Sequence, residues 1–335
     1  MRRNKVAGIR RWLPGLVISA IAILLLIRFS NWQGVIEVLT LLDLNWFAAA
    51  IIFYLLGMVM RALSWKTLLQ NKASYGRVFL TLNEGYLLNN IFPFRLGELG
   101  RAVLLSQATG LSAFFVLSTI VIERAYDVAI AAGLLLATLP FVLGLDAGQT
   151  IASLVMVLVI LGLVSLFLLA RYRQWIMMKL EAYGETRPLF RERILRSVES
   201  MLDGLGALSR VDQFLLSVFY ILVAWLFGTV QLYFLTLSLG IDLQFWWIGF
   251  VVGVISLGIA LPSAPAGLGI YEVAMVGAFS LLGVPTSQAL AVALVAHSIH
   301  ITITGFIGVY AIFRDGETLT GIYLRLKNFR PVSID

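Results

Sequence analysis

Long apolar runs separated by short polar segments make up most of the chain. Because a bilayer core about 30 Å thick takes about 20 apolar residues of α-helix, such runs predict membrane-crossing helices. We expect full helices over the cleanest runs, residues 13–27, 46–65, 151–170, 213–239 and 287–313. A further run at 111–142 carries charges, and the runs at 78–94, 244–261 and 268–283 are short or interrupted. The pattern predicts an all-α polytopic transmembrane helix bundle, one integral membrane domain over residues 1–335 with about 8 to 10 membrane helices or half-helices.

The composition agrees with a chain that lies in lipid. Hydrophobic residues make up 60% of the sequence and charged residues only 13%, and the mean hydropathy is +0.93. A soluble domain needs more charge than this to cover its surface. The sequence has no cysteine, which excludes disulfides, thiol nucleophiles, iron–sulfur clusters and cysteine-ligated zinc.

Lysine and arginine are concentrated in alternate connecting segments. They occur in residues 1–11, 66–77, 171–212 and 314–330, and are absent from residues 29–45, 140–150, 240–244 and 283–287. Because basic loops stay in the cytoplasm, we expect a multi-pass protein of the inner (cytoplasmic) membrane with both termini on the cytoplasmic side. The net charge of +7 then indicates contact with anionic lipid headgroups, and no nucleic-acid partner is expected.

That orientation requires two broken segments. Residues 78–94 and about 102–122 must enter and leave the membrane on the same side, as two short helices or as a re-entrant hairpin. Residues 244–261 and 268–283 must meet at a break within the membrane or near its inner face. Residues 171–212 form the only long polar stretch, with apolar side chains at helical spacing. We expect there either an amphipathic helix on the cytoplasmic membrane surface or a soluble pair of connecting helices.

Polar residues interrupt the apolar pattern in three places, of which the first is residues 83–101. Charges at membrane depth are unfavourable and usually serve function. Pro93 and Gly97 predict a helix break, whose free N–H groups, together with nearby arginine forks, can hold an anion such as phosphate. The candidate substrate-binding residues here are Glu84, Asn90, Arg95, Glu98 and Arg101. The alternative is a cytoplasmic loop in which Arg95–Glu98 and Glu98–Arg101 are ordinary ion pairs.

The second place is the sequence Glu123-Arg124-Ala125-Tyr126-Asp127. On a helix, Asp127 lies three residues after Arg124 and can pair with it, which leaves Glu123 for another partner. Glu123, Arg124 and Asp127 are therefore candidate substrate-binding residues. A self-neutralised cluster that fixes helix packing explains them equally well.

The third place is residues 262–272, where Pro262, Pro265, Gly267 and Gly269 predict a second helix break just before Glu272. A discontinuous helix that lines a substrate cavity explains this pattern, with Glu272 as a binding residue. The simpler explanation is that a glutamate in the first turn stabilises the helix dipole. Both breaks have a proline, then a glycine, then a glutamate. This echo predicts an internal inverted repeat with the binding site between the halves.

The sequence gives no sign of a catalytic residue, a cofactor or a metal site. It lacks the P-loop, the G-x-S-x-G elbow, H-E-x-x-H and the aspartate-rich pattern that binds Mg²⁺. His297 and His300 lie three residues apart on the last long helix, with no carboxylate nearby in the sequence. We expect them to pack against or hydrogen-bond to a neighbouring helix rather than bind a metal.

Three ordered motifs resemble one family. N-x-x-P-x-R-x-G-E-x-x-R stands at residues 90–101, E-R-x-x-D at 123–127 and P-x-x-P-x-G-L-G-x-x-E at 262–272. Together they resemble the membrane region of lysylphosphatidylglycerol synthases, also called the flippase-like or UPF0104 family. Arg61, with the leucine, serine and tryptophan that follow it, is similar to that family too and joins the candidate binding residues. The chain departs from the family at Ala266, where glycine is common.

The resemblance implies a protein that handles lipids. In the full synthases this region is associated with translocation of aminoacylated lipid, and a separate soluble domain transfers the aminoacyl group. We expect no aminoacyl transfer here, because the membrane region accounts for the 335 residues. The resemblance implies a lipid flippase-like transporter that binds an anionic headgroup in a mid-membrane cavity. Two alternatives stay open: a membrane enzyme acting on a lipid-linked substrate, with Glu98 or Glu123 as general base, and a non-catalytic partner of a lipid-synthesis enzyme.

Overall fold

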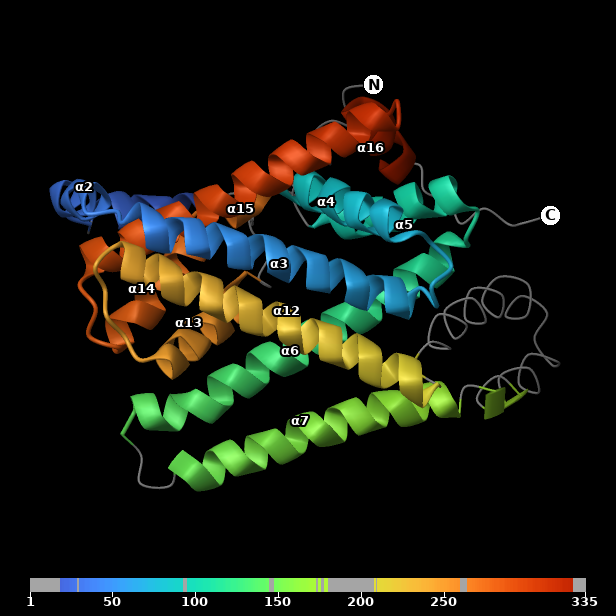
Figure 1. The fold of residues 1–335 in the computed structure, drawn as a ribbon, viewed down its shortest axis with the longest axis horizontal. Coiled ribbons are helices and arrows are strands. Elements are labelled where there is room, and N and C mark those ends of the chain that lie inside the picture. The colour runs from blue at the N-terminus through green and yellow to red at the C-terminus, as the bar shows by residue number, and fades with distance from the viewer. Residues whose placement is uncertain are drawn as a thin grey trace.

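Helices form nearly all of the chain that the computed structural model describes, and the all-α class is confirmed (Figure 1). The described residues are 19–28, 30–92, 95–144, 148–172, 174–175, 178–179, 208, 210–259 and 264–327. The expected amphipathic helix within 171–212 falls almost entirely outside them. So do Pro93 and Pro262.

Four described helices are long and apolar enough to cross a membrane. They are α3 (Leu44–Leu68), α6 (Ala113–Val142), α12 (Val211–Ser238) and α15 (Thr286–Arg314). The helix Ser19–Arg28 and α2 (Trp32–Thr40) meet at an angle of 83° and would together make a fifth span. The predicted helices at 46–65, 151–170, 213–239 and 287–313 are confirmed, the second of them as α7 (Gly148–Arg171), which lies along α6. A short helix, α16 (Leu319–Lys327), follows α15.

Two helical hairpins lie between the long helices. The first consists of α4 (Tyr75–Ile91) and α5 (Leu96–Thr109), and the second of α13 (Phe245–Gly258) and α14 (Ile270–Leu281), with the 3₁₀ turn η2 (Pro265–Gly267) before α14. At 1.5 Å per residue, helices of 14 and 12 residues such as α13 and α14 are about 21 and 18 Å long, less than the bilayer core. Figure 1 shows the hairpins entering from opposite ends of the long helices, the first from the right and the second from the left.

The expected hairpin near residue 94 is confirmed, but its second arm was placed wrongly. We expected that arm at 102–122, whereas α5 ends at Thr109 and α6 begins at Ala113. The reason is Gly110, which has the left-handed backbone (φ 72°) that ends α5. The run at 111–142 is then free to form one long helix. An internal repeat stays a prediction.

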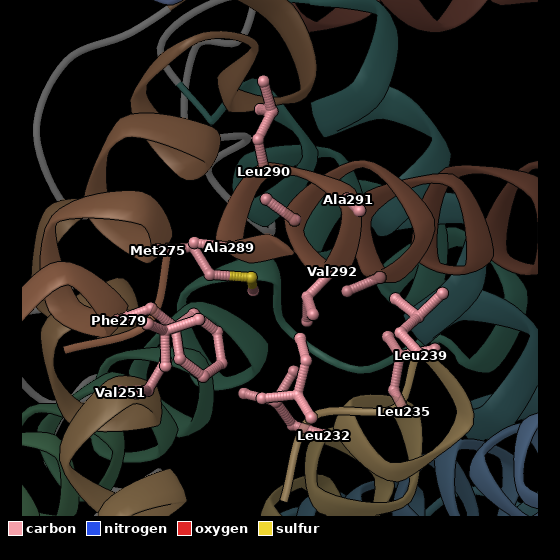
Figure 2. Packing of buried hydrophobic residues seen from close by; sticks show 14 of the residues in the cluster. Leu232, Leu235, Leu239, Val251, Met275, Phe279, Ala289, Leu290, Ala291 and Val292 are labelled. Carbon is pink, nitrogen blue, oxygen red and sulfur yellow. The ribbon is translucent and has the colours of Figure 1, made fainter. Parts of the chain in front are cut away.

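The second hairpin is held by an apolar core. Buried side chains of α12, α13, α14 and α15 meet there, and Figure 2 shows those of Leu232, Leu235, Leu239, Val251, Met275, Phe279, Ala289, Leu290, Ala291 and Val292. The first hairpin packs elsewhere, in a cluster that includes Trp65, Leu82, Leu105 and Ile120. Each hairpin thus has its main core, and Val252 and Leu257 of α13 also pack against the core of the first hairpin.

Candidate functional site

A network of buried charges joins α3, α5 and α6. Glu123 on α6 is fully buried. Its Oε1 accepts hydrogen bonds from Arg61 Nη1 and Arg124 Nη2, each at 2.9 Å, and its Oε2 accepts one from Arg101 Nη2 at 2.5 Å. Asp127 binds Arg61 at 2.8 and 3.0 Å and Arg124 at 2.9 Å. The predicted pairing of Arg124 with Asp127 is confirmed, and the other partners of Glu123 are Arg61 and Arg101.

Arg95 joins the tips of the two hairpins. It precedes α5 in the left-handed conformation, φ 52° and ψ 38°, which is strained for a residue with a side chain. Its Nη2 donates to the carbonyl oxygen of Ile259, at the end of α13, at 3.0 Å. Glu98 lies 3.7 Å from both Arg95 Nη1 and Arg124 Nη1. Two ordinary ion pairs were considered for Glu98. The pair with Arg95 is present, whereas Arg101 pairs with Glu123 of α6 instead.

The charges of this network do not balance. Four guanidinium groups face three carboxylates, namely Arg61, Arg95, Arg101 and Arg124 against Glu98, Glu123 and Asp127. One positive charge is therefore left over within the described residues of the network. A low-dielectric surrounding strengthens the attraction of such a charge for an anion.

Two adjoining cavities open beside the network. The first has a volume of about 430 Å³ and the second of about 340 Å³. The two cavities lie side by side, because they share six lining residues: Tyr54, Tyr86, Arg95, Arg124, Ile259 and His300. The first cavity has mostly polar and aromatic walls and touches both helix breaks. The second lies mainly between α3, α6, α12 and α13, where small and apolar residues form one side and Arg61, Arg124 and Asp127 form another.

Six of the ten candidate binding residues line these cavities. They are Arg61, Asn90, Arg95, Glu98, Arg124 and Asp127. The other four, Glu84, Arg101, Glu123 and Glu272, do not line them. Arg101 and Glu123 form the buried pair described above, and the Arg101 guanidinium lies 4.1 Å from the centre of the Trp65 ring. Glu84 is buried on α4, where it pairs with Arg77, which also contacts Asp315.

Both predicted helix breaks contain unusual backbone. Gly97 follows the first break, and its N–H donates to Asn89 Oδ1 at 2.8 Å. In the second break Pro265 begins η2. Ala266, Gly267 and Gly269 then have φ angles of 60°, 75° and 84°. These positive angles stop α13 from continuing into α14, because an L-residue helix cannot pass through them.

Glu272 lies in the first turn of α14, where the sequence predicted a glutamate that stabilises the start of the helix. Its Oε2 accepts a hydrogen bond from the Gly269 N–H at 2.7 Å, which caps the helix. Its Oε1 lies 2.5 Å from Nδ1 of His297. The other ring nitrogen of His297, Nε2, lies 3.0 Å from the carbonyl oxygen of Ala266. Glu272 thus ties the helix break to α15 and reaches the cavity only through the His297 ring.

Ala266→Gly should stabilise the protein. Alanine at a φ of 60° destabilises the folded state by about 1–2 kcal/mol, and glycine removes this strain. Glycine also makes the unfolded chain more flexible, which lowers the free energy of unfolding by about 0.4–1 kcal/mol. We expect the free energy of unfolding to rise by about 0.5–1 kcal/mol, measured by denaturant titration in detergent with circular dichroism. Ala264→Gly is the matched control. Ala264 has a φ of −59°, so its substitution relieves no strain and should lower stability.

Several cavity residues were not singled out from the sequence. They are Tyr54, Tyr86 and Gln231, which line the first cavity. A polar side chain within an apolar span was the signal available for them. The expectation that the two histidines bind neighbouring helices is confirmed, because His300 Nδ1 lies 2.9 Å from the Tyr54 hydroxyl and His297 contacts α14. Among the described residues no group of three or more histidine, aspartate or glutamate side chains could hold a metal ion.

Similar proteins are known from archaea. A UPF0104 membrane protein of Methanothermobacter thermautotrophicus is 25% identical over 293 residues, which cover 82% of this chain and 86% of that protein. A UPF0104 membrane protein of Methanocaldococcus jannaschii is 25% identical over 333 residues, 91% of this chain and 96% of that one. Glycosyltransferase AglD of Haloferax volcanii is 25% identical over 340 residues, which cover 88% of this chain but only 53% of that protein.

A family model gives the same answer as the motifs. The model described as "Lysylphosphatidylglycerol synthase TM region" matches residues 12–308, a range that contains both hairpins and every residue of the charge network. The relatives and the spans agree on a multi-pass membrane protein. The chain belongs to the lysylphosphatidylglycerol synthase transmembrane-region family.

Proposed function

We propose that this protein is a lipid flippase-like transporter that binds an anionic lipid headgroup in the cavity between the two hairpin tips. The observation that carries the proposal is the surplus positive charge beside that cavity. Arg95 and Arg124 line both parts of it. Their Nη2 atoms are already bonded, that of Arg95 to the Ile259 carbonyl and that of Arg124 to Glu123 and Asp127. Each Nη1 atom lies 3.7 Å from Glu98, beyond hydrogen-bond distance, which leaves the two Nη1 groups to bind a phosphate through charge-assisted hydrogen bonds.

The two parts of the cavity suit the two parts of a lipid. Amide, hydroxyl and imidazole groups surround the first part and can hydrogen-bond to a headgroup. Small and apolar residues, among them Gly57, Ala131, Ala224, Gly228 and Val252, line the second part. An acyl chain can lie along these residues, while Arg61, Arg124 and Asp127 line the side of the same part that adjoins the charge network. A molecule with both parts is an amphiphile, which favours a lipid over a water-soluble anion.

The hairpins support alternating access. Because they enter from opposite ends (Figure 1), opening either one connects the cavity to one side of the membrane, as in transporters with discontinuous helices. The helix ends and the connection at one end carry Lys66, Lys72, Arg77 and Arg314, whereas the connections 41–43 and 239–244 at the other have no lysine or arginine. We infer that the first end, and with it both termini, is cytoplasmic.

Arg95→Gln should slow headgroup translocation at least about tenfold, because one charge-assisted hydrogen bond contributes about 1.5–3 kcal/mol. The protein is reconstituted into vesicles of phosphatidylglycerol and phosphatidylcholine. Periodate then cleaves the glycerol diol of phosphatidylglycerol in the outer leaflet, and the rate at which inner-leaflet lipid becomes accessible is measured.

Arg325→Gln is the matched control, since Arg325 lies on α16 with Gln107 and Glu317 as partners and does not line the cavity. We expect its rate to equal that of the wild-type protein. Equal rates for Arg95→Gln and wild type would refute the assignment of the site. If wild-type protein leaves the rate of protein-free vesicles unchanged, the transport proposal itself fails.

A second candidate is a membrane enzyme that transfers a group to or from a lipid-linked substrate. It is favoured by one relative, which carries the name glycosyltransferase and shares about half of its length with this chain. Glu98, the carboxylate on the wall of the first cavity, would then act as the general base. Mass spectrometry of lipid extract incubated with purified protein would reveal a new product, and an unchanged extract would speak against transfer.

A further inference from the structure

His297 faces two hydrogen-bond acceptors. The side chains of His297 and Glu272 are more than nine-tenths buried. One ring nitrogen lies 2.5 Å from a carboxylate oxygen of Glu272, and the other lies 3.0 Å from the carbonyl oxygen of Ala266. A carbonyl can only accept a hydrogen bond, and an ionised carboxylate likewise. Both contacts are therefore satisfied only if a proton lies in each of them.

A neutral imidazole supplies one of these two protons. The second must be an additional proton, carried either as imidazolium beside ionised Glu272 or as neutral imidazole beside protonated Glu272. In both arrangements the pair is uncharged and holds one proton more than neutral histidine with ionised glutamate. The contacts thus require one bound proton, whichever atom carries it.

Loss of this proton has two consequences for the cavity. One of the two contacts then joins two acceptors, so either Glu272 or the Ala266 carbonyl loses its hydrogen bond. If the Ala266 carbonyl loses its hydrogen bond, the strained turn at Ala266 is no longer held to α15. The pair also gains a negative charge behind the ring of His297, which lines the cavity. That charge repels an anionic headgroup.

We propose that Glu272 and His297 form a one-proton site whose occupancy is coupled to the anionic headgroup, so that a proton accompanies the lipid. This inference rests on the proposed function. Because coupling is reciprocal, a proton on the pair strengthens headgroup binding, and a bound headgroup strengthens retention of the proton. A headgroup with one negative charge and one proton then moves without net transfer of charge.

Other ionisable groups surround the pair and could titrate as well. Those on the cavity wall are Tyr54, Tyr86, Arg95, Glu98, Arg124 and Tyr271, and the Tyr271 ring lies 4.4 Å from that of His297. His300 lies on the same helix and binds Tyr54. The sequence contains only these 2 histidines. His300→Gln is therefore the matched control for His297→Gln.

The first experiment needs no lipid. Difference infrared spectra of purified protein in detergent, recorded across pH 4–10, report the imidazolium and carboxyl bands of the pair. In the wild-type protein and in His300→Gln, the histidine and carboxyl bands should change together as the pH rises, which corresponds to the loss of one proton from the pair. His297→Gln and Glu272→Gln should lack this coupled signal. If wild type shows no coupled signal, the one-proton site does not exist.

The second experiment tests the coupling. Short-chain phosphatidylglycerol is added to wild-type protein in weakly buffered solution at a pH above the infrared transition. We expect uptake of about one proton per lipid bound and weaker lipid binding as the pH rises, about tenfold per pH unit above the transition, as one coupled proton requires. Because His300 lines the cavity, His300→Gln changes the lipid affinity itself, but it should keep this pH dependence, whereas His297→Gln should lose it.

The outcomes separate the two proposals. Lipid binding and translocation without proton uptake, and with the same affinity at every pH, would overturn the coupling and leave the transporter standing. Failure of wild-type protein to bind or move the lipid would overturn the transporter and the coupling with it. If the histidine variant does not fold, proton uptake by wild type still decides between coupling and its absence.

Discussion

Glu123→Gln is expected to lower the free energy of unfolding by about 3–5 kcal/mol, because it leaves a buried charge without its partner. After the substitution, Arg61 and Arg124 still form ion pairs with Asp127. Arg101 keeps no carboxylate among the described residues, although its side chain is only 2% exposed. The loss should be measured by denaturant titration in detergent, followed by circular dichroism.

Two further variants test this explanation. Arg101→Met in the Glu123→Gln background removes the unpaired charge, and the double variant should recover more than half of the lost stability. Glu98→Gln is the matched control, because Glu98 is partly exposed and its ion pairs are 3.7 Å long. It should lose less than about 1 kcal/mol. A double variant as unstable as Glu123→Gln alone would show that the charge is not the cause.

Gly97→Ala is expected to destabilise the first hairpin by about 3 kcal/mol, the upper part of the range for overpacking. An added Cβ would lie 1.9 Å from the carbonyl oxygen of Gly85 and 2.6 Å from Asn89 Oδ1. Because the first of these atoms belongs to the backbone of α4, the two helices must separate. The thermal midpoint, followed by tryptophan fluorescence, should fall, and headgroup translocation should fall with it.

Gly76→Ala is the control for this prediction. Gly76 lies on α4, the helix against which Gly97 of α5 packs, but an added Cβ at Gly76 meets nothing within 4 Å. Since alanine is the better helix former by about 0.5–1 kcal/mol, the midpoint should stay the same or rise. A midpoint for Gly97→Ala that matches the wild type would mean that α4 and α5 do not pack as closely as described.

The sequence predicted the parts of this fold that depend on local pattern. The spans α3, α12 and α15 follow from apolar run length, and the pairing of Arg124 with Asp127 follows from helical spacing. Both helix breaks were found because prolines and glycines interrupt apolar runs. The end of α5 was missed, because Gly110 lies between two segments that are both compatible with a helix.

The parts that depend on distant contacts could not be predicted from one sequence. Arg61 and Glu123 are 62 residues apart, and Tyr54 and His300 are 246 residues apart. Nothing in the local pattern around either residue identifies the other. For the same reason the contact of Glu272 with His297 was not foreseen. Glu272 was predicted as a binding residue, with a role at its own helix end as the alternative; the contact at the helix end is present, and Glu272 is not among the residues that line the cavities. Which candidate residues line a cavity is likewise decided by packing between helices.

The hydrogen bond from Arg95 to Ile259 has a consequence for biogenesis. It joins residues that are 164 positions apart, and the second hairpin is synthesised long after the first. Contacts this distant along the chain form late and slow folding. During synthesis Arg95 therefore lacks its Ile259 partner, and the two hairpin tips can meet only when the last third of the chain has been made. Interruption of synthesis before that point yields a chain in which the first hairpin has no second hairpin to contact.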